Sequence, residues 1–132
     1  MRNTGAKESE VVTMNTLTVN LHLLLASFYK PTSQRYKILF EEKCFPSDRY
    51  MFTTQAQHHG LDPEKTLIPL APRKGEFCLR HEDILAMIEK EGDEIAIVLF
   101  AGVQYYTGQL FDMKSITAAA KAKVRSQYRL VR

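Results

Sequence analysis

Four segments of the chain have the apolar spacing or the end signals of helices. Between residues 17 and 29 apolar side chains recur every three or four positions, which predicts an amphipathic helix that Pro31 terminates. Residues 79–93 predict a second, with isoleucine and leucine on one face, charged residues on the other and Gly92 at its end. The other two predicted helices run from a cap at Ser47 or Asp48 to Gly60, and from Ser115 to Lys123.

Short apolar segments between these helices predict strands. Residues 36–40 and 95–100 are the clearest, and the second, IAIVLF, has no polar alternation, which suits a strand buried on both faces. Residues 10–14 predict a short strand before the first helix, and residues 66–70 a weaker one, because Pro69 favours a sheet edge or a strand end. Strands that alternate with helices predict an α/β fold with a parallel or mostly parallel sheet and helices on both faces.

Composition and charge narrow the range of functions. The chain has 132 residues, 45% hydrophobic and 25% charged, as expected for one globular domain. It has neither a membrane-spanning apolar run nor an apolar signal peptide, so we expect a cytoplasmic protein with no membrane partner. Six of the 18 basic residues follow residue 113, where no acid occurs, so the net charge of +3 reflects the tail and predicts no nucleic-acid partner. Two distant cysteines predict reduced thiols and no metal site.

Three loops are candidate ligand sites, because parallel sheets bind ligands where strands end and helices begin. In the first, residues 15–18, the free N–H groups and the positive dipole end of the helix attract an anion, and a threonine hydroxyl adds a donor. This loop could hold a phosphate without the glycines of a P-loop. The alternative is a plain helix cap by Asn15 or Thr16.

The second and third loops carry aromatic residues. In CFPSD, residues 44–48, a ring directly follows a strand and a carboxylate comes three residues later. Phe45 could stack on a flat heteroaromatic ligand, or it could be a core residue with Asp48 as a charge at the helix start. In FAGVQYYTGQL, Gly102 and Gly108 allow close backbone approach and the tyrosines and threonine offer hydroxyls; the alternative is tyrosines packed on a neighbour.

Together the three loops resemble a known family. The motifs MNTLTVNLH, FPSD and GVQYYTGQ, in this order and at these spacings, are similar to the cofactor-binding half of kynureninases, pyridoxal-phosphate enzymes of the aspartate aminotransferase fold. The similarity covers residue 5 to about residue 123 and includes the charged helix HEDILAMIEKEGD. It implies a three-layer αβα domain of fold type I, present in part as residues 1–123, followed by a basic tail, residues 124–132, unlike the family.

The resemblance also implies a cofactor site. The residues that would contact pyridoxal 5'-phosphate are Leu17, Thr18, Phe45, Pro46, Ser47, Asp48 and Ala101. The first two would hold the phosphate at the helix start. Phe45 would lie against the pyridine ring, and the next three residues would shape that wall, with the Asp48 carboxylate near the ring. Ala101 stands where related animal enzymes have a serine that contacts the cofactor, so the resemblance implies one polar contact fewer in this chain.

The reaction implied by the resemblance is the hydrolysis of kynurenine or 3-hydroxykynurenine to an anthranilate and alanine, in tryptophan breakdown and towards NAD, by a cytosolic homodimer. It needs a lysine that binds the cofactor covalently and an acid for the pyridinium nitrogen. In the family both follow the Ala-rich helix, whereas here VRSQYRLVR follows. We therefore expect a truncated chain without catalytic residues, inactive alone. The alternative is a non-catalytic module that binds phosphate or pyridoxal phosphate, or that pairs with a full-length subunit.

Overall fold

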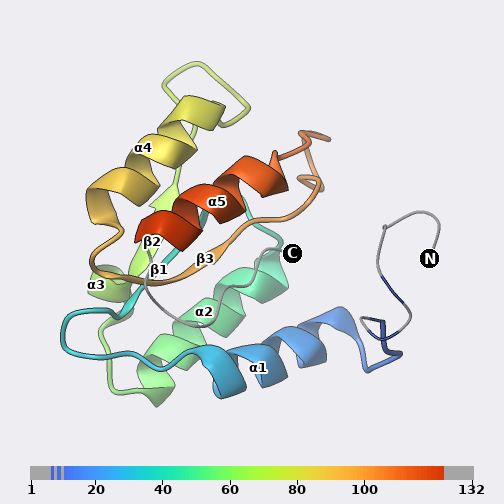
Figure 1. Ribbon diagram of the computed structural model, residues 1–132, viewed down its shortest axis with the longest axis vertical. Coiled ribbons are helices and arrows are strands. Elements are labelled where there is room, and N and C mark those ends of the chain that lie inside the picture. The colour runs from blue at the N-terminus through green and yellow to red at the C-terminus, as the bar shows by residue number, and fades with distance from the viewer. Residues whose placement is uncertain (1–6, 8, 10, 124–132) are drawn as a thin grey trace.

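The computed structural model describes residues 7, 9 and 11–123. In this part of the chain one sheet of three parallel strands has the order β2-β1-β3, with β1 at Lys37–Glu41, β2 at Leu67–Leu70 and β3 at Ile95–Leu99. The helices are α1 (Leu17–Phe28), α2 (Pro46–His58), α3 (Pro63–Thr66), α4 (His81–Glu91) and α5 (Met113–Lys123). In Figure 1, α1 and α2 lie on one side of the sheet and α4 and α5 on the other. The predicted α/β fold with a parallel sheet and helices on both faces is confirmed.

The sheet separates two hydrophobic cores. In β1, Ile38 packs with residues of α1 and α2, and Leu39 with residues of α4 and α5. In β3 the register shifts between Ile95 and Ile97, so that Ala96 is an extra residue in the ladder. The shift places Ile95 in the α4–α5 core and Ile97 in the α1–α2 core, although residues two apart normally share a face. Both cores therefore reach β3, whose five residues are all buried, as its apolar sequence predicts.

The strand predicted at residues 10–14 is wrong. Residues 11–14 are exposed and have no regular structure, and residue 10 lies outside the described residues. Val11 and Val12 have high strand propensity, but a strand forms only where it can pair with the edge of a sheet. Within the described part of the chain this segment pairs with no strand, so α1 follows an irregular segment.

The start of α2 also differs from the prediction. Pro46 is the first helical residue and Phe45 is the N-cap, so Ser47 and Asp48 lie within the first turn and do not cap the helix. Proline suits this position because its ring fixes a helical φ and its missing N–H has no partner there in any helix. Gly60, just after the helix, has a φ of +70°, which lets the chain turn where the sequence predicts.

The other predicted elements lie within two residues of their observed bounds. β2 contains Pro69 and forms an edge of the described sheet, as predicted. The sequence did not predict α3, a single turn in which the Asp62 carboxylate accepts the Glu64 N–H at 3.0 Å. Among the described helices, none combines the length and the apolar character that a membrane span requires. The prediction of a foreign basic tail, residues 124–132, lies outside the described residues.

Candidate functional site

The candidate loops lie at one end of the sheet. The loops after β1 and β3 leave neighbouring parallel strands at their carboxyl ends, and in Figure 1 α1 also begins toward this side. Ligands of parallel α/β sheets bind at this end.

Phe45, Asp48 and Ala101 line one pocket. Its volume is about 140 Å³, and the other residues that line it are Glu41, Gly102, Val103 and Tyr105. The rings of Phe45 and Tyr105 meet edge to face, with centroids 5.1 Å apart and planes at 76°. The structure thus brings together three candidate residues that come from two separate loops.

Phe45 is not a core residue. Its side chain is 47% exposed and belongs to neither core cluster. Tyr105, against which it lies, is 56% exposed. The alternative in which Phe45 only fills the core is therefore wrong, and part of an aromatic surface is left open to a ligand.

Two buried carboxylates give the pocket an acidic character. Asp48 is 4% exposed and Glu41 is 5% exposed. Burial, with the negative charges of these two residues, raises the pKa of the Cys44 thiol to about 12. Cys44 is therefore a protonated thiol at neutral pH and not a nucleophile. Among the described residues that line the pocket, none is basic.

The first turn of α1 has no side-chain cap. Thr16 is the N-cap, but its hydroxyl makes no capping bond, and the Asn15 side chain accepts the Thr16 N–H at 2.8 Å instead of one inside the helix. The Asn20 side chain bonds back to the Asn15 backbone, at 3.1 and 2.8 Å. Thr16 is therefore the N-cap residue by its backbone position, as the alternative predicts, but its side chain makes no capping bond. The N–H groups of Leu17 and Thr18 belong to the first turn of α1, where a helix provides no backbone acceptor of its own.

The other candidate residues lie near the pocket or outside it. Pro46 and Ser47 occupy the first turn of α2 between Phe45 and Asp48, but neither lines the pocket. Leu17 and Thr18 do not line it either. Leu17 is exposed and Thr18 is half-buried.

Sequence reasoning missed Glu41 and Gln104. Glu41 ends the apolar strand KILFE, and a polar residue at that position is a signal for a ligand-facing side chain. Gln104 lies within the GVQYYTGQ motif and is 4% exposed, with hydrogen bonds to Lys43 and to the next residues of its own loop. Its partners come from two loops, which residue spacing does not reveal.

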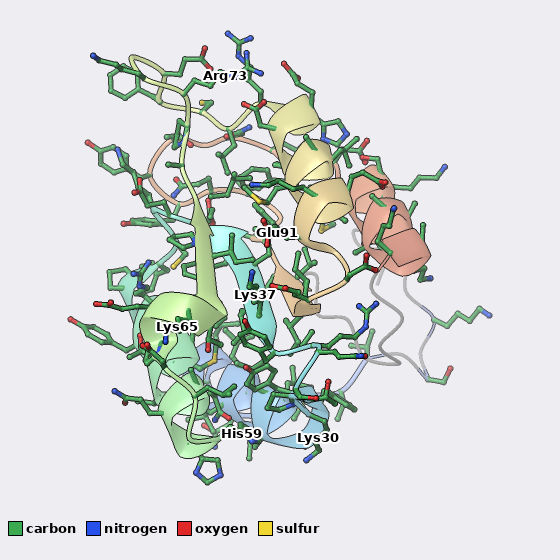
Figure 2. All side chains as sticks on the ribbon, turned by 90° about the vertical axis from the view of Figure 1, so that its left-hand side faces the viewer. Lys30, Lys37, His59, Lys65, Arg73 and Glu91 are labelled. Carbon is green, nitrogen blue, oxygen red and sulfur yellow. The ribbon has the colours of Figure 1, made fainter. Side chains whose placement is uncertain are left out.

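Among the described lysines, none lines this pocket. Lys43 belongs to the loop after β1, where its carbonyl accepts a hydrogen bond from Gln104. Lys37 starts β1, at the opposite end of the strand, and pairs with Glu91 at 2.9 Å (Figure 2) and with Glu94. These two hydrogen bonds raise the pKa of Lys37 above its ordinary value, whereas an amine nucleophile needs a lowered pKa.

Comparison with solved structures identifies the class of fold. The chain superposes on ureidoglycine-glyoxylate aminotransferase from Bacillus subtilis with a TM-score of 0.58 and 21% sequence identity, over 86% of this chain and 26% of that chain. At this identity the likeness concerns the fold alone. It is the α/β fold of an aminotransferase, as predicted.

Sequence comparison then identifies the relatives. The chain is 62% identical to kynureninase from Nematostella vectensis over 119 residues, 62% identical to that from Flavobacterium psychrophilum over 115 residues and 58% identical to that from Homo sapiens over 119 residues. These matches cover 87–90% of this chain but only 26–27% of the first two relatives, so the chain spans about a quarter of their length. No protein-family model matches the chain. The predicted resemblance to kynureninases is thereby confirmed over most of this chain.

Proposed function

We propose that this chain forms part of a kynureninase that uses pyridoxal 5'-phosphate, and that the pocket between Phe45 and Tyr105 receives the pyridine ring. The observation that carries the proposal is the convergence of Phe45, Asp48 and Ala101 on one pocket at the carboxyl end of the sheet. The identity of 58–62% to kynureninases over this segment supports it.

The chemistry of the pocket suits a flat, protonated heteroaromatic ring. Phe45 offers an aromatic surface that is not buried in the core, so a ring can stack on it. The acidic side chains of Asp48 and Glu41 line the same pocket, and a carboxylate there would favour a cationic ring over a neutral one.

The phosphate of the cofactor requires a different place. The pocket is lined by two acids and by no basic residue among those described, so it offers a dianion no cationic partner. The uncapped first turn of α1 offers the N–H groups of Leu17 and Thr18, the Thr18 hydroxyl and the positive end of the helix dipole. We therefore assign the ring to the pocket and the phosphate to α1.

The residues of this chain would bind the cofactor and orient its ring. When bound, pyridoxal phosphate supplies an electron sink for the bonds of an amino-acid substrate. Phe45 would set the plane of the ring and Asp48 would favour its protonated form, whereas Ala101 brings no hydroxyl to the site. Since no described lysine lines the pocket, the covalent anchor is assigned to a part of the subunit outside the pocket-lining residues.

The relationship to kynureninases also suggests the wider role. The proposed substrates are L-kynurenine and 3-hydroxykynurenine, cleaved to anthranilate or 3-hydroxyanthranilate and L-alanine. The proposed setting is tryptophan catabolism and NAD biosynthesis, in a cytoplasmic homodimer.

A complete subunit tests the proposal. In the kynureninase from Nematostella vectensis, the matching 119-residue segment is replaced by that of this chain; this protein is called the complete subunit below. It should bind pyridoxal phosphate, seen by absorbance titration, and release fluorescent anthranilate from kynurenine. A folded complete subunit that binds no cofactor would contradict the proposal. Cofactor binding without anthranilate release would instead favour the non-catalytic module.

A further inference from the structure

Gln104 is a buried amide in the loop that follows β3. Only 4% of its surface is exposed. Its Nε2 donates to the Lys43 carbonyl at 2.7 Å, and its Oε1 accepts the N–H groups of Tyr106 at 2.6 Å and Thr107 at 2.8 Å. A carbonyl cannot donate and a backbone N–H cannot accept, so only this orientation of the amide satisfies all three bonds.

These bonds join the two loops that form the aromatic wall of the pocket. Lys43 precedes Phe45 by two residues on the loop after β1. Tyr106 and Thr107 directly follow Tyr105 on the loop after β3. The amide therefore fixes the backbone on both sides of the edge-to-face contact between Phe45 and Tyr105.

The two rings need such a support because burial does not fix them. Phe45 is 47% exposed and Tyr105 is 56% exposed, so neither has the close packing that holds a core side chain in one rotamer. Their relative orientation therefore depends on the backbone that carries them. Gln104 itself does not line the pocket.

We infer that Gln104 is a positioning residue: by tying the loop of Tyr105 to the loop of Phe45, it sets the ring plane on which the pocket receives a heteroaromatic ligand. The identity of that ligand rests on the proposed function, whereas the hydrogen bonds of Gln104 do not. Gln104 affects ligand binding through the two rings and not through contact with the ligand.

The variant Gln104→Glu tests this inference in the complete subunit. An ionised glutamate can still accept the N–H groups of Tyr106 and Thr107, but it has no donor for the Lys43 carbonyl, so the link between the loops is lost. We expect the dissociation constant of pyridoxal phosphate to rise about tenfold, the usual effect of one lost hydrogen bond that orders a site. Gln104→Met, which removes the bonds without adding a charge, should give the same result.

Gln109→Glu is a matched control from the same loop. The Gln109 amide accepts the Leu79 N–H at 3.0 Å and donates to the Leu79 carbonyl at 2.6 Å, so the variant also loses one donor bond to a backbone carbonyl. Gln109 does not line the pocket, and the bonds of its amide that the structure describes run to Leu79. Both variants should lower the temperature of unfolding, but only Gln104→Glu should change the dissociation constant by more than about twofold.

A double variant identifies the route of the effect. Tyr105→Ala alone should weaken binding, and adding Gln104→Glu to it should weaken binding no further, because residues that act through one another are not additive. The inference would be overturned if the losses of affinity in the double variant multiplied. It would also be overturned if Gln104→Glu and Gln109→Glu changed the affinity equally, or if Gln104→Glu left the affinity unchanged. Failure of the proposed function is distinguishable, since the unaltered complete subunit would then bind no cofactor.

Discussion

At the scale of single residues, Phe45 and Phe52 show how burial separates a binding role from a structural one. Phe52 is fully buried and packs on Phe40 with centroids 4.6 Å apart. Phe45, seven residues earlier, occupies the N-cap position of the same helix and is 47% exposed beside the pocket. A phenylalanine side chain is therefore expected to contribute to stability at position 52 and to ligand binding at position 45.

Replacing Phe45 by leucine should weaken cofactor binding and leave stability nearly unchanged. Leucine keeps the apolar bulk but removes the aromatic face, which contributes about 0.5–1.5 kcal/mol beyond burial. The measurements are a pyridoxal phosphate titration of the complete subunit and thermal unfolding of its cofactor-free form. Phe52→Leu is the control and should show the opposite pattern. A loss of stability without a change in affinity at Phe45 would contradict the assigned role.

Replacing Thr18 by valine should reduce cofactor affinity by about 1–3 kcal/mol, because one charge-assisted hydrogen bond to the phosphate is lost. Thr53→Val is a suitable control, since the Thr53 hydroxyl bonds within α2, to the Arg49 carbonyl at 3.0 Å. The affinity of the complete subunit for inorganic phosphate should change in parallel. Equal affinities of Thr18→Val and the unaltered protein would exclude α1 as the phosphate site.

His59 makes stability depend on pH. Burial, followed by the charges of His58 and Lys30, lowers the pKa of His59, whose ring packs on Tyr29 with centroids 5.2 Å apart. In the unfolded chain the imidazole titrates near its ordinary value of about 6.5. Below that pH the unfolded state binds more protons than the folded state, so stability falls until the folded pKa is passed.

His59→Gln should therefore reduce the loss of stability between pH 6.5 and lower pH, relative to the unaltered chain. The measurement is urea unfolding at a series of pH values. His58→Gln removes one neighbouring charge but leaves the burial of His59, so most of the pH dependence should persist in that control. If stability depends on pH as steeply in His59→Gln as in the unaltered chain, groups other than His59 cause the pH dependence.

At the scale of elements, the spacing of apolar residues predicted most of the helices and strands. The strand that it predicted wrongly depended on pairing with another strand. The strand IAIVLF and the helix HEDILAMIEKE follow directly from their apolar pattern. Residues 11–14 have strand propensity but pair with neither edge strand of the described sheet, which only the assembled sheet can reveal. At the site, the motifs identified Phe45 and Asp48, whereas the bonds of Gln104 join loops 61 residues apart.

Gly92 marks the contact between the ends of α4 and α5. A Cβ atom at this position would lie 2.8 Å from the Cβ of Lys123 and closer still to the Ile88 carbonyl oxygen. We expect Gly92→Ala to destabilise the fold by about 1–3 kcal/mol, the usual cost of overpacking. In thermal unfolding, a lower unfolding temperature of Gly92→Ala would confirm the close contact. A higher one would contradict it, because Gly→Ala at a position with a helical φ and free space stabilises a protein.

At the scale of the whole molecule, the 132-residue chain offers an aromatic and acidic pocket and a helix start without a side-chain cap, but none of the described lysines lines that pocket. We expect the chain alone, mixed with pyridoxal phosphate, to release no anthranilate from kynurenine above the rate of free cofactor, because no described lysine lines the pocket proposed for the ring. The complete subunit, assayed under the same conditions, is the control and should release it. Lys43→Arg and Lys37→Arg should leave any background rate of the chain unchanged. Anthranilate release by the chain alone that one of these substitutions abolishes would instead assign the covalent role to that lysine.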